Sequence, residues 1–205
     1  MTEEHSYIII VAGTPGTGKT TISLLLSKEL QCRFIDSSKL FVEKRIARED
    51  PTGRHTHVID NSSAIKFITK IIHNNSCYIV ETHYPILWIN TAESDIAFTI
   101  LLRAHPIILY DRLKQKRWPI PKIIENSIAE ATNIVAEELY EWSHMTFEVD
   151  TSRKYPKETI NEIFNLIYEW KTGIRIDWLL ADENLTTILS RWLVELDRYK
   201  YGFRE

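Results

Sequence analysis

The stretch Gly13-Thr14-Pro15-Gly16-Thr17-Gly18-Lys19-Thr20 decides the fold, because it matches the phosphate-binding pattern G-x-x-x-x-G-K-[ST] at every fixed position. Residues 8–11, just before it, are β-branched without interruption, which is typical of a strand buried on both faces of a parallel sheet. Apolar residues recur at helical spacing over residues 19–30, just after it. The sequence therefore predicts a strand, a phosphate-binding loop and a helix in succession.

The chemistry of this loop predicts that it binds a nucleoside triphosphate together with Mg²⁺. Glycines permit positive φ angles, so successive backbone amides can point at phosphate oxygens at the start of a helix. We expect Lys19 to bridge the β- and γ-phosphates, the Thr20 hydroxyl to bind Mg²⁺, and Thr21 to contact the α-phosphate. The loop residues expected to bind the nucleotide are Gly13, Gly16, Thr17, Gly18, Lys19, Thr20 and Thr21. The same loop occurs in kinases, ATPases and GTPases, so it does not identify the phosphate acceptor.

The rest of the chain alternates strand and helix patterns. Further strands are predicted at 32–36, 77–80, 97–102 and 146–150, and helices at 107–113, at 122–142 and from Pro156 to near Gly173. Residues 37–75 mix helical pattern with a breaker-rich loop, Asp50 to Gly53, and form an insertion. This alternation predicts an α/β fold of the P-loop NTPase type, with a five-stranded parallel sheet flanked by helices. Residues 173–205 continue as a helical C-terminal extension with an aromatic-rich composition.

Composition indicates an ordinary globular protein. The 205 residues suit one domain with an appendage, and 44% of them are hydrophobic. A net charge of -3 gives no reason to expect broad attraction to nucleic acid or membranes. Cys32 and Cys77 lie in or beside apolar runs, so we expect buried free thiols in a reducing compartment. The first five residues carry no basic cluster typical of a secretion signal, so a cytoplasmic location is expected.

Two side chains at the end of the third strand are candidate catalytic groups. The strand rule places Glu81 and His83 at the same sheet edge as the phosphate loop and Arg103. Glu81 could hold a magnesium-bound water or orient an attacking oxygen, and His83 would point to the same side of an extended chain. The alternatives are a strand-end cap for Glu81 and a hydrogen-bonded loop histidine for His83. No Asn-Lys-x-Asp follows any predicted strand, which argues against a GTPase.

A cluster of cations precedes Pro119. A phosphoryl-transfer enzyme needs mobile cations that close over the transferred group, so this segment is a candidate lid over about residues 114–126. A charge run is also common on a solvated face. Trp118 is expected to pack on the following helix, although it could also cover the nucleotide. The cations of the cluster are Arg112, Lys114, Lys116 and Arg117.

Several patches together resemble the atypical adenylate kinases of archaea and the eukaryotic nucleus, the isoenzyme 6 type. The resemblance spans about residues 7–171. Where that family usually has Asp, this chain has Glu81, and its Lys116-Arg117-Trp118 stands where the family usually has Arg-Gly-aromatic. Either Lys116 or Arg117 would be the phosphate-contacting cation of the lid. The patches are residues 13–21, Glu81-Thr82-His83, Leu102-Arg103, Tyr110 to Leu113, Lys122 to Asn126 and Ala129-Glu130.

The resemblance implies an adenylate-kinase-like domain over residues 1–172, with a monophosphate-binding insertion at about 36–75. It implies a nucleoside monophosphate kinase that uses ATP and Mg²⁺, also hydrolyses ATP, and assists small-ribosomal-subunit maturation with a platform ribosomal protein as partner. The catalytic residues would be Lys19, Glu81, His83, Lys116 and Arg117, with Arg112 also at the nucleotide and Thr20 and Glu81 at the metal. Direct contact with nucleic acid or a membrane is not expected.

Two other functions remain open from the sequence. The protein could be an assembly factor whose ATP hydrolysis switches its hold on a ribosomal protein, with little kinase activity. It could also be a small-metabolite kinase, because the insertion matches the family least and does not fix the acceptor.

Overall fold

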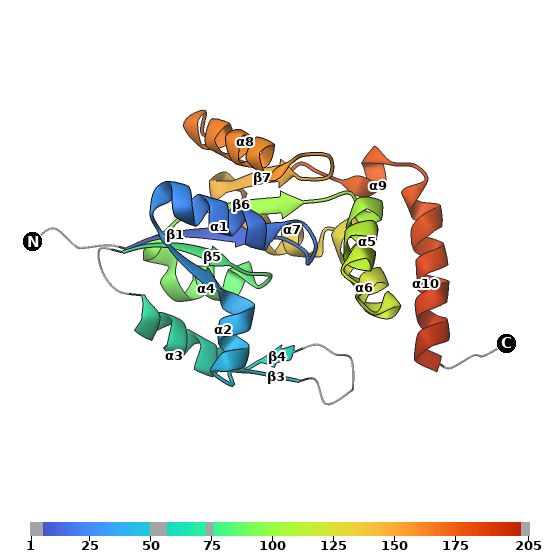
Figure 1. Cartoon of the computed structure of the whole chain (residues 1–205), viewed down its shortest axis with the longest axis horizontal. Coiled ribbons are helices and arrows are strands. Elements are labelled where there is room, and N and C mark those ends of the chain that lie inside the picture. The colour runs from blue at the N-terminus through green and yellow to red at the C-terminus, as the bar shows by residue number, and fades with distance from the viewer. Residues whose placement is uncertain (1–5, 50–56, 73–75, 202–205) are drawn as a thin grey trace, which may run out of the picture.

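Five parallel strands form the sheet at the centre of the molecule (Figure 1). The computed structural model describes residues 6–49, 57–72 and 76–201. The predicted α/β fold is confirmed, and β1 lies in the middle of the sheet, where the strand order changes direction and ligands of such folds bind. In spatial order the strands are β2 (Arg33–Asp36), β5 (Cys77–Glu81), β1 (Tyr7–Ala12), β6 (Ile96–Arg103) and β7 (Thr146–Asp150).

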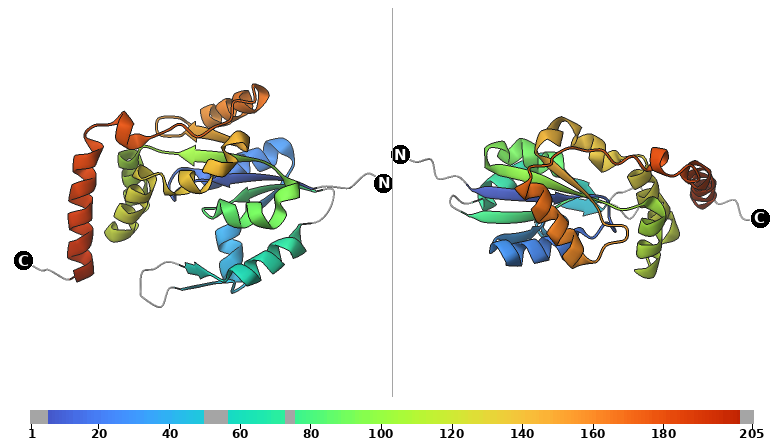
Figure 2. Two further views of the ribbon diagram at one scale, coloured as in Figure 1. Left: turned by 180° about the vertical axis from the view of Figure 1, so that it is seen from behind. Right: turned by 90° about the horizontal axis from the view of Figure 1, so that it is seen from above.

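Helices cover both faces of the sheet (Figure 2). Because side chains alternate along a strand, Ile9 and Val11 of β1 face α1 (Lys19–Leu30) and α8 (Pro156–Tyr168). Ile8 and Ile10 face the opposite layer. That layer contains α2 (Ser37–Glu43), α3 (Asn61–Ile71), α4 (Pro85–Ala92) and α7 (Ile134–Glu138). Burial on both faces is the reason that the central strand β1 is apolar at every position.

The predicted helix over residues 122–142 is wrong as a single element. The structure divides it into α6 (Ile120–Ala131), α7 and a 3₁₀ segment, η2 (Tyr140–Met145). The break occurs at Asn133, whose φ of 60° is left-handed, and asparagine adopts that conformation more readily than most residues. The Asn133 side-chain oxygen also accepts a hydrogen bond from Arg103. The predicted helix at 107–113 is confirmed as α5 (Pro106–Gln115).

The insertion between β2 and β5 is more ordered than its sequence indicated. After α2 the chain forms β3 (Ala47–Glu49) and β4 (His57–Ile59), which pair antiparallel as a separate two-stranded sheet, and then α3. The predicted breaker-rich loop from Asp50 to Gly53 lies outside the described residues. The helix α4 and the short 3₁₀ helix η1 (Glu93–Asp95), which follow β5, did not appear among the predicted elements.

The C-terminal extension is helical, as predicted, and it packs along one side of the molecule (Figure 1). It contains α9 (Trp178–Ala181) and α10 (Leu185–Tyr201). Trp178, Leu189 and Trp192 form a buried cluster with α6. The helix before it, α8, ends at Tyr168 and not near Gly173 as predicted, because residues 169–173 turn so that the Gly173 amide can donate to Thr146 O beside the sheet.

The two cysteines form a disulfide, so the prediction of free thiols is wrong. The Cys32 and Cys77 sulfurs lie 2.00 Å apart, and the Cα atoms 4.7 Å. Arg33 pairs with Tyr78 in the β2 and β5 register, which places the preceding residues, Cys32 and Cys77, side by side at the start of adjacent strands. The sequence separation of 45 residues gave no sign of this neighbourhood, because register appears only when the sheet assembles.

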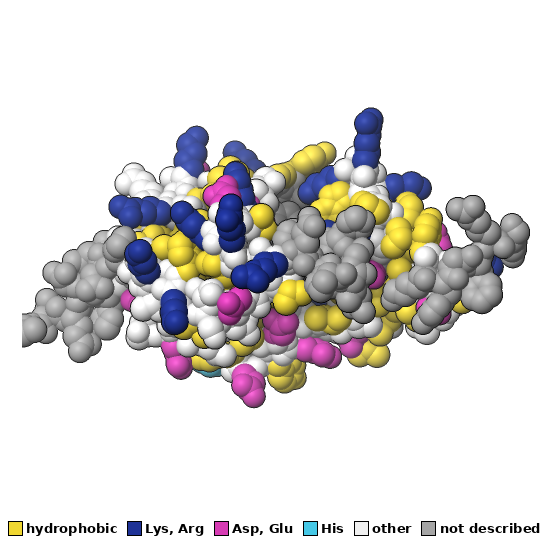
Figure 3. Space-filling view, turned by 90° about the horizontal axis from the view of Figure 1, so that it is seen from below, with side chains coloured by type: hydrophobic (Ala, Val, Ile, Leu, Met, Phe, Trp, Pro, Cys, Tyr) yellow, Lys and Arg dark blue, Asp and Glu magenta, His cyan; other side chains and the backbone are white. Residues whose placement is uncertain are grey.

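The face formed by the insertion is unevenly charged (Figure 3). Basic side chains gather toward one side of this face and acidic ones toward the other, although the chain as a whole carries a charge of -3. Lys66 and Lys70 of α3 and Arg48 of β3 are exposed in this part of the molecule. Among the described residues no helix is both long and apolar enough to span a bilayer.

Candidate active site

The loop between β1 and α1 has the backbone conformation that its glycines predict. Gly13 has a φ of +144°, and a Cβ there would lie 2.4 Å from the backbone oxygen of Leu102. Gly18, with a φ of +99°, is the N-cap of α1. These conformations favour glycine, and they place the amino end of α1 beside the loop. The positive end of the helix dipole and the free amides of its first turn therefore face the loop, as anion binding requires.

Lys19 lies inside the loop. Its ammonium group donates a hydrogen bond of 3.2 Å to Thr14 O, and only 7% of the residue is exposed. Burial lowers the pKa of Lys19 to about 8, although the charges of Glu81 and Glu130 partly oppose this effect. A lysine in this environment remains mostly protonated at neutral pH, and it gains stabilisation from any anion that enters the loop.

Glu81 and Thr20, the two predicted metal-binding residues, are in direct contact. The Thr20 hydroxyl donates a 2.7 Å hydrogen bond to Glu81 Oε1. Burial raises the pKa of Glu81, and Glu81 Oε2 is buried without a hydrogen-bond partner among the described residues. A buried carboxylate oxygen without a partner costs free energy of folding. This atom can therefore accept a proton, coordinate a cation or accept a hydrogen bond from a water.

The same residues fit Mg²⁺. Within residues 6–49, 57–72 and 76–201, no group of three or more His, Cys, Asp or Glu residues could hold a metal by itself. Magnesium in nucleotide sites needs no such cage, since one or two protein oxygens, the phosphates and several waters complete its octahedron. Thr20 and Glu81 provide protein oxygens of this kind.

His83 is neutral and faces the insertion. Its Nδ1 lies 3.1 Å from the Ser38 hydroxyl of α2, and its ring lies 4.1 Å from the ring of Tyr84. Burial lowers the pKa of His83 to about 3, and the charges of Lys19 and Lys122 add to the effect. At neutral pH the imidazole therefore carries no charge, and one of its nitrogens can accept a proton or a hydrogen bond.

One cavity beside the loop, which we call the donor cavity, has a volume of about 340 Å³. Arg112 of α5 lines it, and its guanidinium donates to Thr151 O at 2.5 Å and to Gly16 O at 3.4 Å. Lys116 lines the same cavity. The cavity is lined by Gly16, Thr17, Gly18, Thr21, Ile22, Arg112, Gln115, Lys116, Thr151, Lys154, Pro156 and Thr159.

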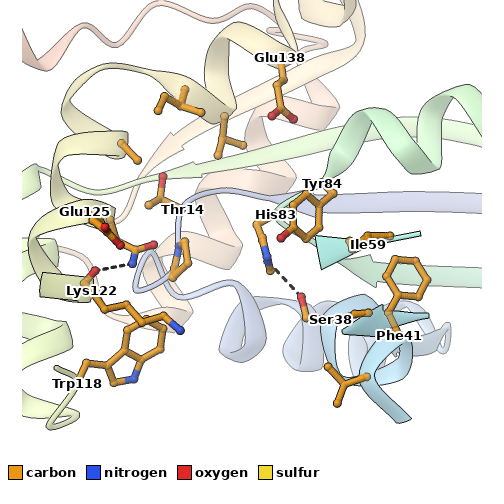
Figure 4. Close-up of a pocket in the computed structure, with 17 residues that line it drawn as sticks. Thr14, Ser38, Phe41, Ile59, His83, Tyr84, Trp118, Lys122, Glu125 and Glu138 are labelled. Atoms are coloured by element: carbon orange, nitrogen blue, oxygen red, sulfur yellow. Dashed lines mark hydrogen bonds between the residues drawn. The ribbon is translucent and has the colours of Figure 1, made fainter. Parts of the chain in front are cut away.

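A second cavity, the acceptor cavity, lies on the other side of the loop and has a volume of about 440 Å³ (Figure 4). Figure 4 shows Lys122 of α6 and Trp118, just before this helix, on one side of the cavity, and Tyr84, Phe41 and Ile59 on the other. Thr14 and Pro15 line this cavity, whereas the next three loop residues, 16–18, line the donor cavity. The phosphate loop therefore separates and borders both cavities.

Two of the four predicted lid cations, Arg112 and Lys116, line the donor cavity, and the other two line neither cavity. Lys116 lines the donor cavity, but Arg117 lines neither cavity and has the left-handed φ of 58° just after α5. The Lys114 ammonium lies 6.0 Å from the ring of Tyr110. Trp118 packs against a buried cluster of α5 and α6, as predicted, and it also lines the acceptor cavity.

Arg103 reaches the carboxyl edge of the sheet, as the strand pattern predicts, but it is buried among protein groups. It is 1% exposed, and it forms ion pairs of 2.8 Å with Glu130 and with Glu148. Its partners make it part of the scaffold behind the phosphate loop.

Comparison with known proteins places this arrangement in a family. A family model described as "AAA domain" matches residues 9–133, which is more than half of the chain. The chain belongs to the AAA domain family. The match begins in β1 and continues through the phosphate loop, the insertion and α6.

Archaeal relatives of this AAA domain protein extend the similarity to nearly the whole chain. A protein of Saccharolobus solfataricus named "Putative adenylate kinase" is 33% identical over 192 residues, covering 93% of this chain and 95% of the relative. A protein of Pyrococcus furiosus with the same name is 32% identical over 185 residues, covering 89% and 97%. The first alignment leaves less than a tenth of this chain uncovered, whereas residues 174–205 make up more than a tenth. The alignment therefore includes part of the extension, which lay outside the resemblance found from the sequence.

Solved structures support the fold of this AAA domain protein. A shikimate kinase from Acinetobacter baumannii, in complex with shikimate, has a TM-score of 0.57 at 16% identity, covering 82% of this chain and 96% of that one. A sugar kinase from Janibacter sp. HTCC2649 has a TM-score of 0.57 at 14% identity, covering 79% and 94%. At these identities the likeness concerns the fold alone.

Sequence reasoning missed several residues that border the cavities. Thr151 and Lys154 follow β7 and line the donor cavity. The rule that ligands bind beyond the carboxyl ends of strands could have indicated the loop after the fifth strand. Glu138 and Val135 of α7, which line the acceptor cavity, had no comparable signal because the predicted continuous helix hid the turn at Asn133.

Proposed function

We propose that this chain is a nucleoside monophosphate kinase of the adenylate kinase type, which transfers the γ-phosphate of ATP to AMP or a related monophosphate. The observation that carries the proposal is that successive residues of one phosphate loop border two cavities, with Gly16 to Gly18 on the donor side and Thr14 and Pro15 on the acceptor side. The names of the archaeal relatives support the same reading.

In this proposal ATP lies in the donor cavity with its phosphates in the loop. Arg112 and Lys116 line this cavity beside the loop, and Lys19 neutralises charge on the β- and γ-phosphates. The acceptor lies beneath the insertion, between α2 and β4 on one side and α6 on the other. Its phosphate oxygen attacks the γ-phosphorus in line, the bond between the γ-phosphorus and the β,γ-bridging oxygen breaks, and ADP leaves with that oxygen. Positioning and charge neutralisation carry most of the acceleration in reactions of this kind.

Magnesium, bound with ATP, would neutralise charge that develops on the phosphate oxygens. The residues that would hold it are Thr20, through its hydroxyl, and Glu81, through a water. Glu81 also keeps the Thr20 hydroxyl oriented by its 2.7 Å hydrogen bond. Arg117 lies outside both cavities, so we assign the cation of the proposed lid to Lys116.

The test is product analysis with purified protein. ATP and AMP together should yield ADP far faster than ATP alone yields inorganic phosphate, and Lys19→Ala should abolish both reactions. A panel of other monophosphates and of hydroxyl-bearing metabolites distinguishes the monophosphate kinase from a small-metabolite kinase. Fast transfer to a sugar or a carbocyclic alcohol, with none to any monophosphate, would reject the proposal.

One specific observation favours ATP hydrolysis as a second candidate activity. Glu81 Oε2 has no hydrogen-bond partner among the described residues, and the neighbouring His83 is neutral, so either group can accept a proton from an attacking water. A phosphate acceptor is already ionised and needs no such base. If inorganic phosphate is released from ATP at the same rate in the presence and in the absence of AMP, the protein is better described as an ATPase switch.

The domain boundaries and cellular role remain predictions. We propose a catalytic unit over residues 1–172, with a monophosphate-binding insertion at about 36–75 and a lid at about 114–126. A platform protein of the small ribosomal subunit as partner and a cytoplasmic location also stay predictions. The disulfide between Cys32 and Cys77 removes the free-thiol argument that pointed to a reducing compartment.

A further inference from the structure

A buried carboxylate on α6 joins the phosphate loop to the C-terminal extension. Glu130 is 2% exposed, and its Oε2 accepts a 2.5 Å hydrogen bond from the hydroxyl of Thr14 in the loop. Its Oε1 accepts from the indole nitrogen of Trp178 at 3.0 Å, and Trp178 is the first residue of α9. Thr14, near the start of the chain, and Trp178, near its end, are therefore linked by two hydrogen bonds through the side chain of Glu130.

The charge of Glu130 is balanced inside the protein. Arg103 Nε donates to Glu130 Oε1 at 2.8 Å, and the Ala104 amide donates to the same oxygen at 3.1 Å. Together with the Thr14 hydroxyl and the Trp178 indole, these donors give both oxygens of the buried carboxylate hydrogen-bond partners, as a buried charge requires. A carboxylate held this firmly fixes the position of the Thr14 hydroxyl that binds it.

The start of the extension is held to the same network at a second point. Arg103 also pairs with Glu148 of β7 at 2.8 Å. Glu148 Oε2 accepts hydrogen bonds from the backbone amides of Arg175 at 2.5 Å and Ile176 at 2.9 Å. Trp178 is therefore delivered to Glu130 by a backbone segment that is itself anchored to the sheet.

Thr14 transmits this constraint to Lys19. The Thr14 carbonyl oxygen accepts hydrogen bonds from the Lys19 ammonium at 3.2 Å and from the Thr17 hydroxyl at 2.9 Å. Rotation of Thr14 would displace the carbonyl that orients both side chains. We propose that Glu130 and Trp178 are positioning residues for the phosphate loop, so that the C-terminal extension is part of the nucleotide site. This inference rests on the proposed function, in which the loop binds ATP.

A purely structural role for the extension predicts something different. The extension also buries apolar side chains against α6, and Trp192 of α10 stacks on Tyr110 with ring centres 5.2 Å apart. If burial alone mattered, truncating either tryptophan would have the same effect on the loop. Among the described residues Trp192 makes no hydrogen bond to Glu130, so it is the matched control for Trp178.

The first measurement needs no nucleotide. In the full chain, Trp178→Phe keeps an aromatic ring but removes the indole N–H. We expect amide hydrogen exchange in the loop, residues 13–20, to accelerate roughly fivefold in Trp178→Phe and to stay unchanged in Trp192→Phe. Equal exchange in Trp178→Phe and the wild type, or equal acceleration in both variants, would overturn the positioning role.

The second measurement approaches the link from the loop. Thr14→Val removes the hydroxyl that binds Glu130, and Thr14→Ser keeps it. We expect Thr14→Val and Trp178→Phe each to raise KM for ATP roughly fivefold with a smaller change in kcat, and Thr14→Ser, which keeps the hydroxyl, to raise KM for ATP clearly less than Thr14→Val does. Because both substitutions break one chain of bonds, the double variant should be no worse than the poorer single variant. Fully multiplicative effects would show that the two residues act independently, and Thr14→Val against Thr14→Ser decides the matter even if Trp178→Phe does not fold.

The outcomes distinguish failure of the proposed function from failure of the positioning role. If the wild type binds no MgATP, the proposed function fails, while the exchange measurement still reports whether Trp178 holds the loop. If the wild type binds MgATP and Trp178→Phe changes neither exchange nor KM, the proposed function stands and the positioning role is rejected.

Discussion

The donor and acceptor cavities lie on two sides of one loop, but they are built in different ways. The donor cavity is bordered by backbone and cations, with loop glycines, Arg112 and Lys116 around it. The acceptor cavity is bordered by large side chains, among them Phe41, Tyr84 and Trp118. The first arrangement suits an anion of fixed shape, and the second suits a planar apolar group whose identity depends on how the walls fit.

This difference teaches where specificity resides. The phosphates of every nucleoside triphosphate are alike, so a short local motif is sufficient to bind them. The acceptor must be distinguished from similar molecules, and its walls come from α2, β4, α6 and α7, which are far apart in sequence. Substitutions on the donor side should therefore affect every reaction, and those on the acceptor side should affect selectivity.

The largest effect should come from Lys19. Lys19→Ala removes the only buried ammonium in the described part of the loop, and we expect kcat/KM to fall at least about a thousandfold with every acceptor, because positive charge at the transferred phosphate is lost. Initial-rate kinetics with several monophosphates measure this. Lys28→Ala, at an exposed position of the same helix α1, is the control and should leave the rates unchanged. A loss confined to one acceptor would contradict the division between the cavities.

A smaller but still general effect is expected at Glu81. Glu81→Gln keeps the shape of the side chain and removes its charge. The Thr20 hydroxyl and bound water should then be oriented less well, and we expect kcat to fall roughly a hundredfold. Glu81→Asp, which keeps a carboxylate, should retain more activity than Glu81→Gln. The Mg²⁺ concentration that gives half-maximal rate should rise in Glu81→Gln, and no change in that value would remove Glu81 from the metal site.

The sequence predicted the structure well wherever the pattern within a single segment determines what that segment forms. Strands β1 and β5 were predictable because each is apolar over four or more successive residues, and the phosphate loop because its glycines and Lys19 follow a fixed spacing. Glu81 and His83 were found because strand ends of a parallel sheet meet at one edge. These predictions require no knowledge of which strand lies beside which.

Features that depend on two distant segments were not predictable. The disulfide requires the register between β2 and β5. The acceptor wall contributed by α7 requires the left-handed turn at Asn133, which Arg103 stabilises from β6. The link between Trp178 and Thr14 requires the extension to dock on α6. In each case a contact that appears only in the folded chain decided the local structure.

The acceptor side gives a more selective prediction. Trp118→Ala opens the wall of the acceptor cavity, where the Lys122 ammonium lies 4.9 Å from its ring. We expect KM for the monophosphate to rise about tenfold, because contact with the acceptor is lost, and KM for ATP to change less than about twofold. Tyr168→Ala, which truncates a 92% exposed ring at the end of α8, is the control for aromatic truncation. Equal changes in both KM values would show that the two cavities are not independent.

The smallest effect is a pH dependence that belongs to the donor side alone. Lys19 has a pKa of about 8 in the free protein, and a bound polyphosphate favours its charged form and so raises that pKa. Below pH 8 the lysine is already protonated and affinity for ATP is constant; above pH 8 binding must take up a proton, so affinity falls as pH rises. A single titrating group predicts a loss of roughly fourfold between pH 7 and pH 8.5. Calorimetry with MgATP measures it.

The control for this titration is Lys19→Arg, because arginine keeps its charge throughout this range. Its affinity should be independent of pH, whatever its absolute value. The other charged groups near the Lys19 ammonium are Glu81, Glu130, Lys116 and Asp36. Affinity for the monophosphate should show no such fall, since its cavity is lined mainly by uncharged side chains. If affinity for ATP and affinity for the monophosphate fell equally as pH rises, the titrating charge would act on the acceptor cavity as well. The donor and acceptor cavities would then differ in shape only.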